Sequence, residues 1–466
     1  MPVIILVADG ARPDTLAAAM DRGELPAMSQ LRAEGGSHVV TTCWPSVTGM
    51  AYAPFLMGMY PGHVGLPGLR WFDRSRRIGR LMGHARSYVG SGMRHVDADL
   101  TGPARTAYEL TARRLGALSV IHRGLPLRDR LGFGPAFALR AARTHFRGNV
   151  RGWLAIDREI GHEVAARIRR DRPQFVFAAF TGIDKTSHSE GHDAPVVRDA
   201  MRIVDEAVAE IRHDAERAGT WGDTHLWVVS DHGHSPVKWH DDLAEWFRST
   251  GHKVLAHPWT FGGGQDVAVM VSGNAMAHLY LGLEPRQRPG WDALRGRWQP
   301  VLDALLTRPS VDLVIAPQDV SRTLIFGRGR GCASLRAADG AYTYAPMTGD
   351  PLGIGPVGPV DASAAWEATR ESDYPDVFVQ VVSLLQSSRI GDLIISAARD
   401  WDLRAKYEPI PHFSSHGALH REHMLVPLLL NRPTTRAPRR TVEVLPSAMR
   451  ALGIRSPNEV DGSAYL

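Results

Sequence analysis

The chain begins Met1-Pro-Val-Ile-Ile-Leu-Val-Ala-Asp9-Gly10, and this opening already indicates a fold class. An apolar run from Val3 to Ala8 leads directly into a carboxylate and a glycine. Such a continuous run is typical of a strand that is buried on both faces, as in parallel sheets. It is too short for a signal-peptide core, and no basic segment precedes it. We therefore expect a first parallel strand that ends on Asp9.

Similar apolar runs recur along the chain, separated by helical patterns. Strands are predicted over Phe175–Phe180, Leu226–Ser230 and Leu425–Leu430, and helices over Asp14–Glu34 and Pro195–Arg217. In the second helix the apolar residues recur every three or four positions. Alternation of strands and helices predicts an α/β protein with a doubly wound, mostly parallel sheet and helices on both faces.

Two long segments fit this pattern poorly. We interpret residues 1–466 as a single catalytic domain, and we expect insertions or cap regions at about 75–155 and 236–405. The second segment holds short strand signals, among them Val311–Ala316 and Asp392–Ala397. Both insertions are expected to flank the active site, where ligands of open α/β sheets bind.

Composition excludes several classes of protein. The chain is 44% hydrophobic and 22% charged, which is ordinary for a globular protein and excludes general disorder. Its 2 cysteines exclude a disulfide framework and, with the lack of a signal peptide, favour a cytoplasmic location. No block of like charge indicates nucleic-acid binding, and no run approaches the roughly 20 apolar residues of a membrane span. The net charge of +5 is compatible with an anionic small-molecule substrate. Nothing in the sequence indicates the oligomeric state.

Acidic and histidine side chains follow the predicted strands at several points. Carboxyl ends of strands in open α/β sheets meet at one edge, where catalytic groups and ligands collect. Each residue has an alternative interpretation as a helix cap, a surface pair or a solvated loop histidine. Together they offer the nitrogen and oxygen donors that zinc accepts. In chain order they are Asp9, Asp184, His188, Asp231, His232 and His416.

The segment Pro45-Ser-Val-Thr48-Gly49 supplies the context for these residues, with Gly58, Pro61 and Gly65 following it. Here the chain resembles the alkaline phosphatase superfamily, and most closely its type I phosphodiesterase/nucleotide pyrophosphatase family. In that family a nucleophilic threonine begins a helix and is followed by a similar Gly, Pro and Gly. The Asp and His motifs also appear in the family's order.

The resemblance implies a zinc-dependent hydrolase of phosphate esters, a phosphodiesterase, nucleotide pyrophosphatase or phosphatase. Its substrate would be a small-molecule phosphate ester. Thr48 would form a phosphothreonine intermediate. Two Zn²⁺ ions are expected, although other divalent metals also suit such donors. The first ion would be held by Asp184, His188 and His416, and the second by Asp9, Thr48, Asp231 and His232.

The chain departs from the family pattern in two places. The family asparagine that binds a phosphoryl oxygen is missing, and its register falls on Gly68-Leu69-Arg70-Trp71. Arg70 is therefore predicted to act as the phosphate ligand, with a surface role as the alternative. Cys43-Trp44-Pro45-Ser46 resembles the start of the sulfatase signature, but Val47 occupies the position of its arginine. Cys43 is therefore expected to be a buried, inert side chain.

Two alternatives to phosphate ester hydrolysis stay open on the sequence. One is hydrolysis of phosphonate or sulfate esters by the same fold, and the other is a catalytically silent binding protein. Several further histidines lie near the metal motifs in sequence. We expect these to support the ligands and not to bind metal directly: His192, His234, His240, His420 and His423.

Overall fold

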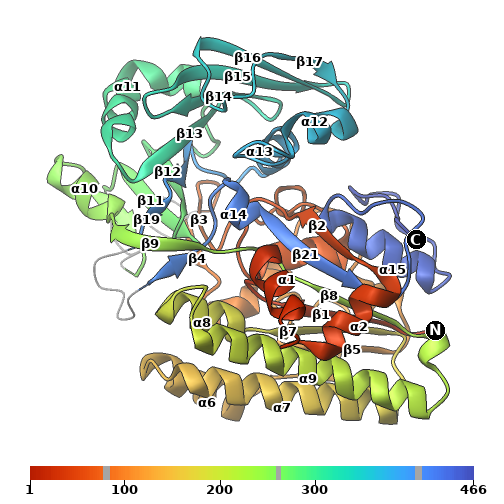
Figure 1. The fold of residues 1–466 in the computed structure, drawn as a ribbon. Coiled ribbons are helices and arrows are strands. Elements are labelled where there is room, and N and C mark those ends of the chain that lie inside the picture. Colours follow the sequence, from red (N-terminus) through yellow and green to blue (C-terminus); the bar gives the residue numbers. More distant parts are fainter. Residues whose placement is uncertain (77–83, 259–263, 405–411) are drawn as a thin grey trace.

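A seven-stranded sheet forms the centre of the molecule (Figure 1). The computed structural model describes residues 1–76, 84–258, 264–404 and 412–466. The five strands from β8 to β6 run parallel, and β21 pairs antiparallel with β8. In spatial order the strands are β2 (Ser37–Thr41), β21 (Leu425–Leu430), β8 (His225–Val229), β1 (Val3–Ala8), β7 (Phe175–Phe180), β5 (Arg114–Ala117) and β6 (Arg130–Leu131).

Both faces of this sheet are covered, which explains the continuous apolar runs. Along β1, Ile4 and Leu6 belong to one core, while Val3, Ile5 and Val7 belong to the other. The first core is closed by α1 (Pro13–Asp21), α2 (Pro26–Gly35), α7 (Val150–Asp171), α8 (Gly182–Glu190) and α9 (Pro195–Arg217). The second includes α3 (Ala53–Met57), α4 (Val96–Asp99), α5 (Ala107–Leu110) and α15 (Val444–Ala451), and α6 (Pro135–Phe146) packs on α7.

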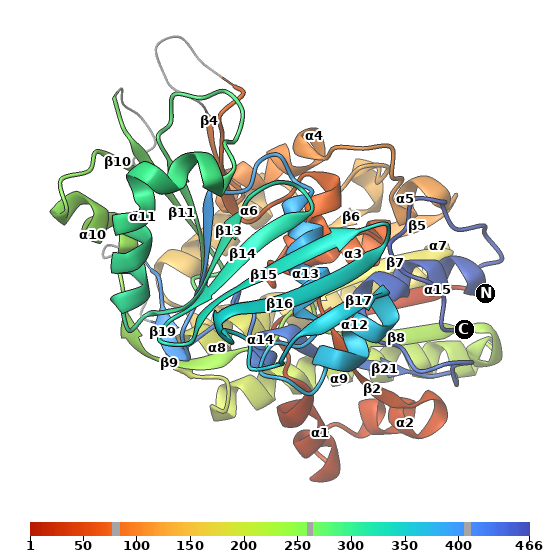
Figure 2. The same ribbon diagram turned by 90° about the horizontal axis from the view of Figure 1, so that it is seen from above.

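A second sheet of nine strands, mostly antiparallel, lies over the carboxyl-end side of the first (Figures 1 and 2). It is covered by α12 (Ala362–Thr369) and α13 (Val377–Leu385) on one face, and by α10 (Leu243–Ser249) and α11 (Trp291–Thr307) on the other. Its order is β10 (Val254–Ala256), β11 (Val267–Ser272), β12 (Met276–Leu281), β18 (Leu393–Ala397), β13 (Val311–Pro317), β14 (Arg322–Gly327), β15 (Gly331–Ala338), β16 (Ala341–Gly349) and β17 (Val357–Val360).

Two small sheets and a short helix complete the described elements. The first sheet joins β19 (Asp400–Asp402), β9 (Ser235–His240) and β20 (Ser414–Ser415), and α14 (Arg421–Met424) follows it in the chain. The second is the antiparallel pair β3 (Arg70–Asp73) and β4 (His84–Ser87). Among the described residues, none of the helices is long and apolar enough to cross a membrane.

The predicted fold class is confirmed, with differences in detail. The strands at 3–8, 175–180 and 425–430 have the predicted bounds, and β8 begins one residue before its predicted start. The single helix predicted over 14–34 is wrong, because the positive φ of Gly23 and the proline at Pro26 divide it into α1 and α2. The assignment of 75–155 and 236–405 as insertions stays a prediction.

Candidate active site

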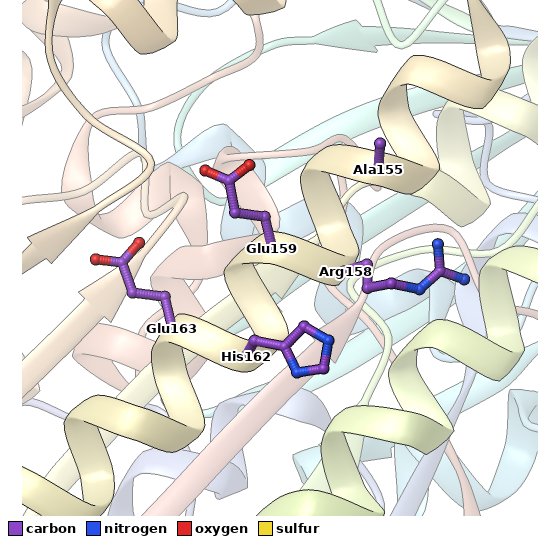
Figure 3. Close-up of a pocket in the computed structure, with 5 residues that line it drawn as sticks. All are labelled: Ala155, Arg158, Glu159, His162 and Glu163. Atoms are coloured by element: carbon purple, nitrogen blue, oxygen red, sulfur yellow. The ribbon is translucent and has the colours of Figure 1, made fainter.

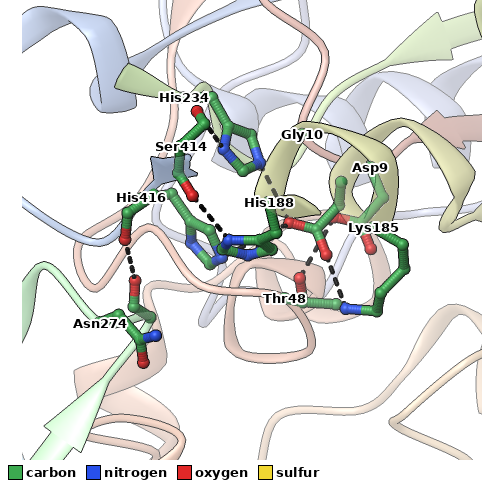
Figure 4. Close-up of polar contacts among 12 residues, drawn as sticks. Asp9, Gly10, Thr48, Lys185, His188, His234, Asn274, Ser414 and His416 are labelled. Carbon is green, nitrogen blue, oxygen red and sulfur yellow. Dashed lines mark hydrogen bonds and ion pairs between the residues drawn. The ribbon is translucent and has the colours of Figure 1, made fainter. Parts of the chain in front are cut away.

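The sequence-predicted side chains meet where the central strands end (Figure 4). In the sheet register Ala8 lies beside Phe180, and Val7 beside Val229. Asp9 and Asp231 therefore emerge at the same edge of the sheet, and Asp184 follows on the first turn of α8. All three carboxylates are buried, with at most 1% of the residue exposed.

The first group of side chains surrounds the hydroxyl of Thr48. Its Oγ1 lies 3.2 Å from Asp9 Oδ1, to which it donates a hydrogen bond, and 3.0 Å from His232 Nε2. The same His232 nitrogen is 3.3 Å from Asp9 Oδ1 and 3.7 Å from Asp231 Oδ2. Asp9, Asp231 and His232 form a group able to hold a metal ion, with donor atoms within 4.8 Å of one another.

The second group surrounds Asp184 Oδ1. The Nε2 atoms of His234, His188 and His416 lie 3.0, 3.1 and 3.6 Å from this oxygen. Asp184, His188 and His234 form one group able to hold a metal ion, and Asp184, His232 and His416 form another. His416 also stacks on His232, with ring centroids 3.6 Å apart, so it contacts a residue of the first group as well.

The histidine rings are oriented by acceptors on their outer sides. The Nδ1 atoms of His188, His416 and His232 donate to the backbone carbonyls of Ser414, Ser46 and Gly233, at 2.8, 2.9 and 3.1 Å. A carbonyl oxygen only accepts, so each of these rings carries its hydrogen on Nδ1 when neutral. Each Nε2 then directs a lone pair into the site, as in histidines that bind metals.

The polar groups of the site fit divalent cations. Within the described residues, Asp231 Oδ2 is buried and accepts no hydrogen bond. A buried carboxylate oxygen without a hydrogen bond is costly unless a cation neutralises it. Three carboxylates and four imidazoles supply the oxygen and nitrogen donors that zinc prefers. The donor set therefore suits one or more such ions.

Burial and mutual charge shift the protonation equilibria at this centre. Burial raises the pKa of Asp231 far above its usual range, and the charge of Asp9 raises it further. Burial lowers the pKa of His232, but the carboxylates of Asp231 and Asp9 outweigh this effect and raise it to about 9. For His234 burial prevails, which lowers its pKa to about 3. The buried carboxylates thus attract positive charge to the site.

The segment before α3 positions the Thr48 hydroxyl. Gly49 has φ +87°, and a 3₁₀ turn begins at Met50 before the five-residue α3. The expectation that Thr48 begins a regular helix is therefore wrong, because the left-handed backbone of Gly49 turns the chain first. Cys43 is fully buried, as expected, and its burial raises the pKa of the thiol well above the usual range.

Arg70 lies at the start of β3, near the second sheet. The preceding Leu69 donates its N–H to Ser272 Oγ at 2.5 Å. In the loop after β11, Gly273 follows Ser272 and has φ +60°. A Cβ on Gly273 would lie 3.0 Å from the His416 carbonyl oxygen and 2.8 Å from the Val47 side chain. The loop after β11 therefore connects β3 to the site. Burial and the charge of Arg70 lower the pKa of His257 to about 4, and the phosphate role of Arg70 stays a prediction.

Sequence reasoning missed two side chains at the centre. His234 was expected only to support the ligands, yet its Nε2 faces Asp184 as closely as that of His188. Lys185 was not singled out, although its Nζ lies 2.7 Å from Asp184 Oδ2 (Figure 4). The available signals were the run Asp231-His232-Gly233-His234 and the position of Lys185 directly after a predicted ligand.

A separate hollow lies on the outer surface of α7 (Figure 3). Two of its residues pair with the neighbouring helix α9, Arg158 with Glu206 at 3.2 Å and His162 with Glu210 at 2.7 Å, and Glu159 pairs with Arg140 of α6. Exposed pairs of this kind are typical of a solvated helix surface. The hollow is lined by Ala155, Arg158, Glu159, His162 and Glu163, none of them a predicted site residue.

Comparison with known proteins finds one family whose model matches this chain and solved structures with a similar fold. The family model described as type I phosphodiesterase / nucleotide pyrophosphatase matches residues 3–295. No curated protein matches the chain by sequence. Phosphonoacetate hydrolase from Sinorhizobium meliloti, solved with phosphonoformate, has a TM-score of 0.58 at 16% identity, over 97% of this chain and 96% of its own. Murine ectonucleotide pyrophosphatase / phosphodiesterase 5 has a TM-score of 0.59 at 14% identity, over 99% and 98%.

Proposed function

The chain belongs to the type I phosphodiesterase / nucleotide pyrophosphatase family, and on that premise we propose that it is a metal-dependent hydrolase of phosphate esters. Thr48 is the proposed nucleophile. The observation that carries the proposal is the position of its hydroxyl, 3.2 Å from Asp9 Oδ1 and 3.0 Å from His232 Nε2. Isolated threonine hydroxyls are weak nucleophiles and need such neighbours for activation.

Two groups of residues would hold the metal ions. Asp9, Thr48, Asp231 and His232 would hold one, and Asp184, His188 and His416 the other. When bound, a pair of divalent ions supplies a lowered pKa for an attacking hydroxyl or water and positive charge beside a phosphoryl centre. Zinc is the proposed metal because the donors are imidazole nitrogens and carboxylate oxygens.

The chain's own residues then provide the nucleophile and its orientation. Thr48 Oγ1 gives up its proton and bonds to phosphorus as the ester P–O bond breaks, and the departing oxygen takes up a proton and leaves as the alcohol. Asp9 Oδ1 already accepts the Thr48 hydroxyl hydrogen, which directs an oxygen lone pair away from the carboxylate. A water molecule then cleaves the phosphothreonine, which restores the hydroxyl and releases phosphate or a phosphate monoester. Asp9 is itself oriented by the fold, through its N–H bond to the Phe180 carbonyl at 3.1 Å.

Two basic residues are candidates for binding the phosphoryl oxygens in place of the family asparagine. Arg70 offers a planar, bidentate donor, as its position in the sequence predicts. Lys185 offers an ammonium that lies within the centre, 2.7 Å from Asp184 Oδ2, with a third of its side chain exposed. The position of Lys185 makes it the more direct candidate.

The buried position of Cys43 disfavours sulfatase-type chemistry. That chemistry requires the cysteine-derived group to reach the substrate, whereas the Cys43 side chain is 0% exposed. Its Sγ faces the Pro45 carbonyl at 3.9 Å. The nucleophile of this chain is therefore proposed to be Thr48 alone.

A substrate screen on zinc-loaded protein tests the proposal. Phosphate monoesters, phosphate diesters, nucleotides and phosphonate monoesters are assayed while the metal content is measured on the same sample. Thr48→Ala is expected to abolish turnover and to retain the fold. Cys43→Ala is the matched control and is expected to keep activity. Turnover by Thr48→Ala at the wild-type rate would contradict the proposal, as would loss of activity in Cys43→Ala with Thr48 intact.

A further inference from the structure

His234 occupies a position that the predicted ligand sets leave unassigned. We propose that His234 is a direct ligand of the ion held by Asp184, His188 and His416, which gives that ion four protein donors. The inference rests on the proposed metal dependence and deepens it, because it assigns different coordination to the two ions. Its basis is the arrangement of donor atoms around Asp184.

Three imidazole nitrogens converge on one carboxylate oxygen. His234 Nε2 lies 3.0 Å from Asp184 Oδ1, compared with 3.1 Å for His188 and 3.6 Å for His416. Of the three, His234 is the nearest, and its side chain is fully buried. Asp184, His188 and His234 also have their donor atoms within 4.8 Å of one another.

The hydrogen bonds on the outer side of His234 fix which nitrogen faces the site. Ser414 Oγ donates its hydrogen to the Ser235 carbonyl at 2.9 Å, which leaves the oxygen as an acceptor. His234 Nδ1 lies 3.1 Å from that oxygen and therefore donates to it. In the neutral ring Nε2 then carries a lone pair directed at a carboxylate oxygen. Two acceptors at this distance repel each other unless a proton or a metal cation lies between them, and a metal cation would be shared with the other two imidazoles.

The backbone around His234 leaves space for its imidazole ring. A Cβ on Gly10 would lie 2.9 Å from His234 Nε2, so the glycine after Asp9 leaves the space that the imidazole fills. The His234 carbonyl accepts a hydrogen bond of 2.6 Å from Arg12 Nη1, which holds the loop after β8 against the start of α1. Side-chain packing and backbone contacts therefore both keep Nε2 directed toward Asp184.

The identity of the donors would distinguish the two metal positions. Each position would offer four protein donors, but the Asp9 position includes the hydroxyl of Thr48, which reacts during turnover. The Asp184 position, with three imidazoles and a carboxylate, offers donors that zinc prefers and would hold its ion more tightly. The Asp9 position includes the reactive Thr48 hydroxyl and would keep the more exchangeable ion. We therefore expect two ions of unequal affinity.

Metal binding to His234→Gln tests this assignment. Glutamine keeps a polar side chain near Ser414 but is a poor zinc ligand. His162→Ala, which removes an exposed imidazole from α7, is the control for nonspecific binding. Zinc affinity is measured by competition with a chromophoric chelator, and coordination by the intensity of the cobalt(II) d–d bands, which is strongest for four-coordinate sites. Loss of a supporting partner typically lowers metal affinity about 10–100-fold, so we expect His234→Gln to weaken the tighter site by more than 100-fold.

If His234→Gln does not fold, a measurement on the wild-type protein alone still tests the assignment. X-ray absorption of wild type carrying one equivalent of zinc is expected to show three imidazoles around the metal. Two imidazoles, or cobalt bands in His234→Gln as intense as in wild type, would overturn the assignment. Failure of wild type to bind any metal would instead contradict the proposed function. Two ions bound equally tightly by wild type and by His234→Gln would contradict only the role of His234.

Discussion

The Lys185 ammonium lies in a centre that is otherwise acidic, and Lys185→Met is expected to have two opposite effects. If Lys185 binds the phosphoryl group, the variant loses a charged donor where negative charge develops in the transition state. Loss of one such donor lowers the rate about 10²–10³-fold. kcat/KM for a phosphate ester is therefore expected to fall by that factor. Methionine retains the unbranched apolar length of the lysine side chain, so packing changes little.

Metal binding is expected to become tighter in the same variant. The ammonium lies 2.7 Å from Asp184 Oδ2 and therefore repels any cation bound to that carboxylate. A unit charge and a divalent ion about 4 Å apart interact by about 8 kcal/mol at an effective dielectric constant near 20. Because the Lys185 side chain is 34% exposed, solvent screening reduces this. About a sixth of it, roughly 1.4 kcal/mol, would still tighten metal binding about tenfold.

The assay measures kcat/KM and zinc affinity together. Lys238→Met is the matched control, since that lysine is 63% exposed on β9 and pairs with Asp400. Arg70→Ala is compared in parallel, because the sequence assigned the phosphate role to Arg70. Lys185→Met reacting within about threefold of wild type, well short of the loss of one donor, would refute the reasoning. If Arg70→Ala alone shows the full loss, the guanidinium and not the ammonium binds the phosphoryl group.

Three further outcomes follow from the structure. Thr48→Ala is expected to lower kcat by more than about 10⁴-fold, as loss of a nucleophile does elsewhere, with metal content measured to show that the ions remain. Chelation is expected to lower the thermal midpoint, since free zinc at 100 times its dissociation constant contributes about 2.7 kcal/mol to stability. Burial lowers the pKa of His278 to about 4 from the usual 6.5, so its contribution to stability is lost as the pH falls from about 6.5 to 4. Urea unfolding across that range is expected to show a loss of stability that is about 3 kcal/mol smaller in His278→Gln than in wild type.

The buried strands could be predicted from sequence because both faces of the main sheet are apolar. The runs at 3–8, 175–180 and 425–430 leave no polar position, and the structure gives them those bounds. The direction of β21 could not be predicted, because an antiparallel strand buried on both faces has the same apolar run as a parallel one. Between β8 and β21 the chain forms the whole second sheet, a connection whose end point periodicity does not indicate.

The residues of the site could be predicted from the sequence, but the contacts among their side chains could not. The ends of β1, β7 and β8 bring Asp9, Asp184 and Asp231 together, as the strand alternation predicts. His234 was assigned only a supporting role because periodicity carries no information about the direction of a loop side chain. That direction depends on Gly10, which leaves the space, and on Ser414, which orients the ring from more than 150 residues away in sequence.

The charges of the centre are coupled to metal binding. Without ions, the raised pKa values of Asp231 and His232 keep protons at the centre, and these protons and the Lys185 ammonium offset the negative charge of the buried carboxylates. Metal ligands bind in their deprotonated forms, so two divalent cations would displace these protons and, with Lys185, would leave about two positive charges over the carboxylates. This charge matches a phosphate monoester dianion, so we expect substrate binding to follow metal binding. A phosphate diester, with one negative charge, would leave the centre with excess positive charge. The charge balance thus favours a substrate that carries a second anionic group within reach of Lys185, such as a terminal phosphate or a carboxylate.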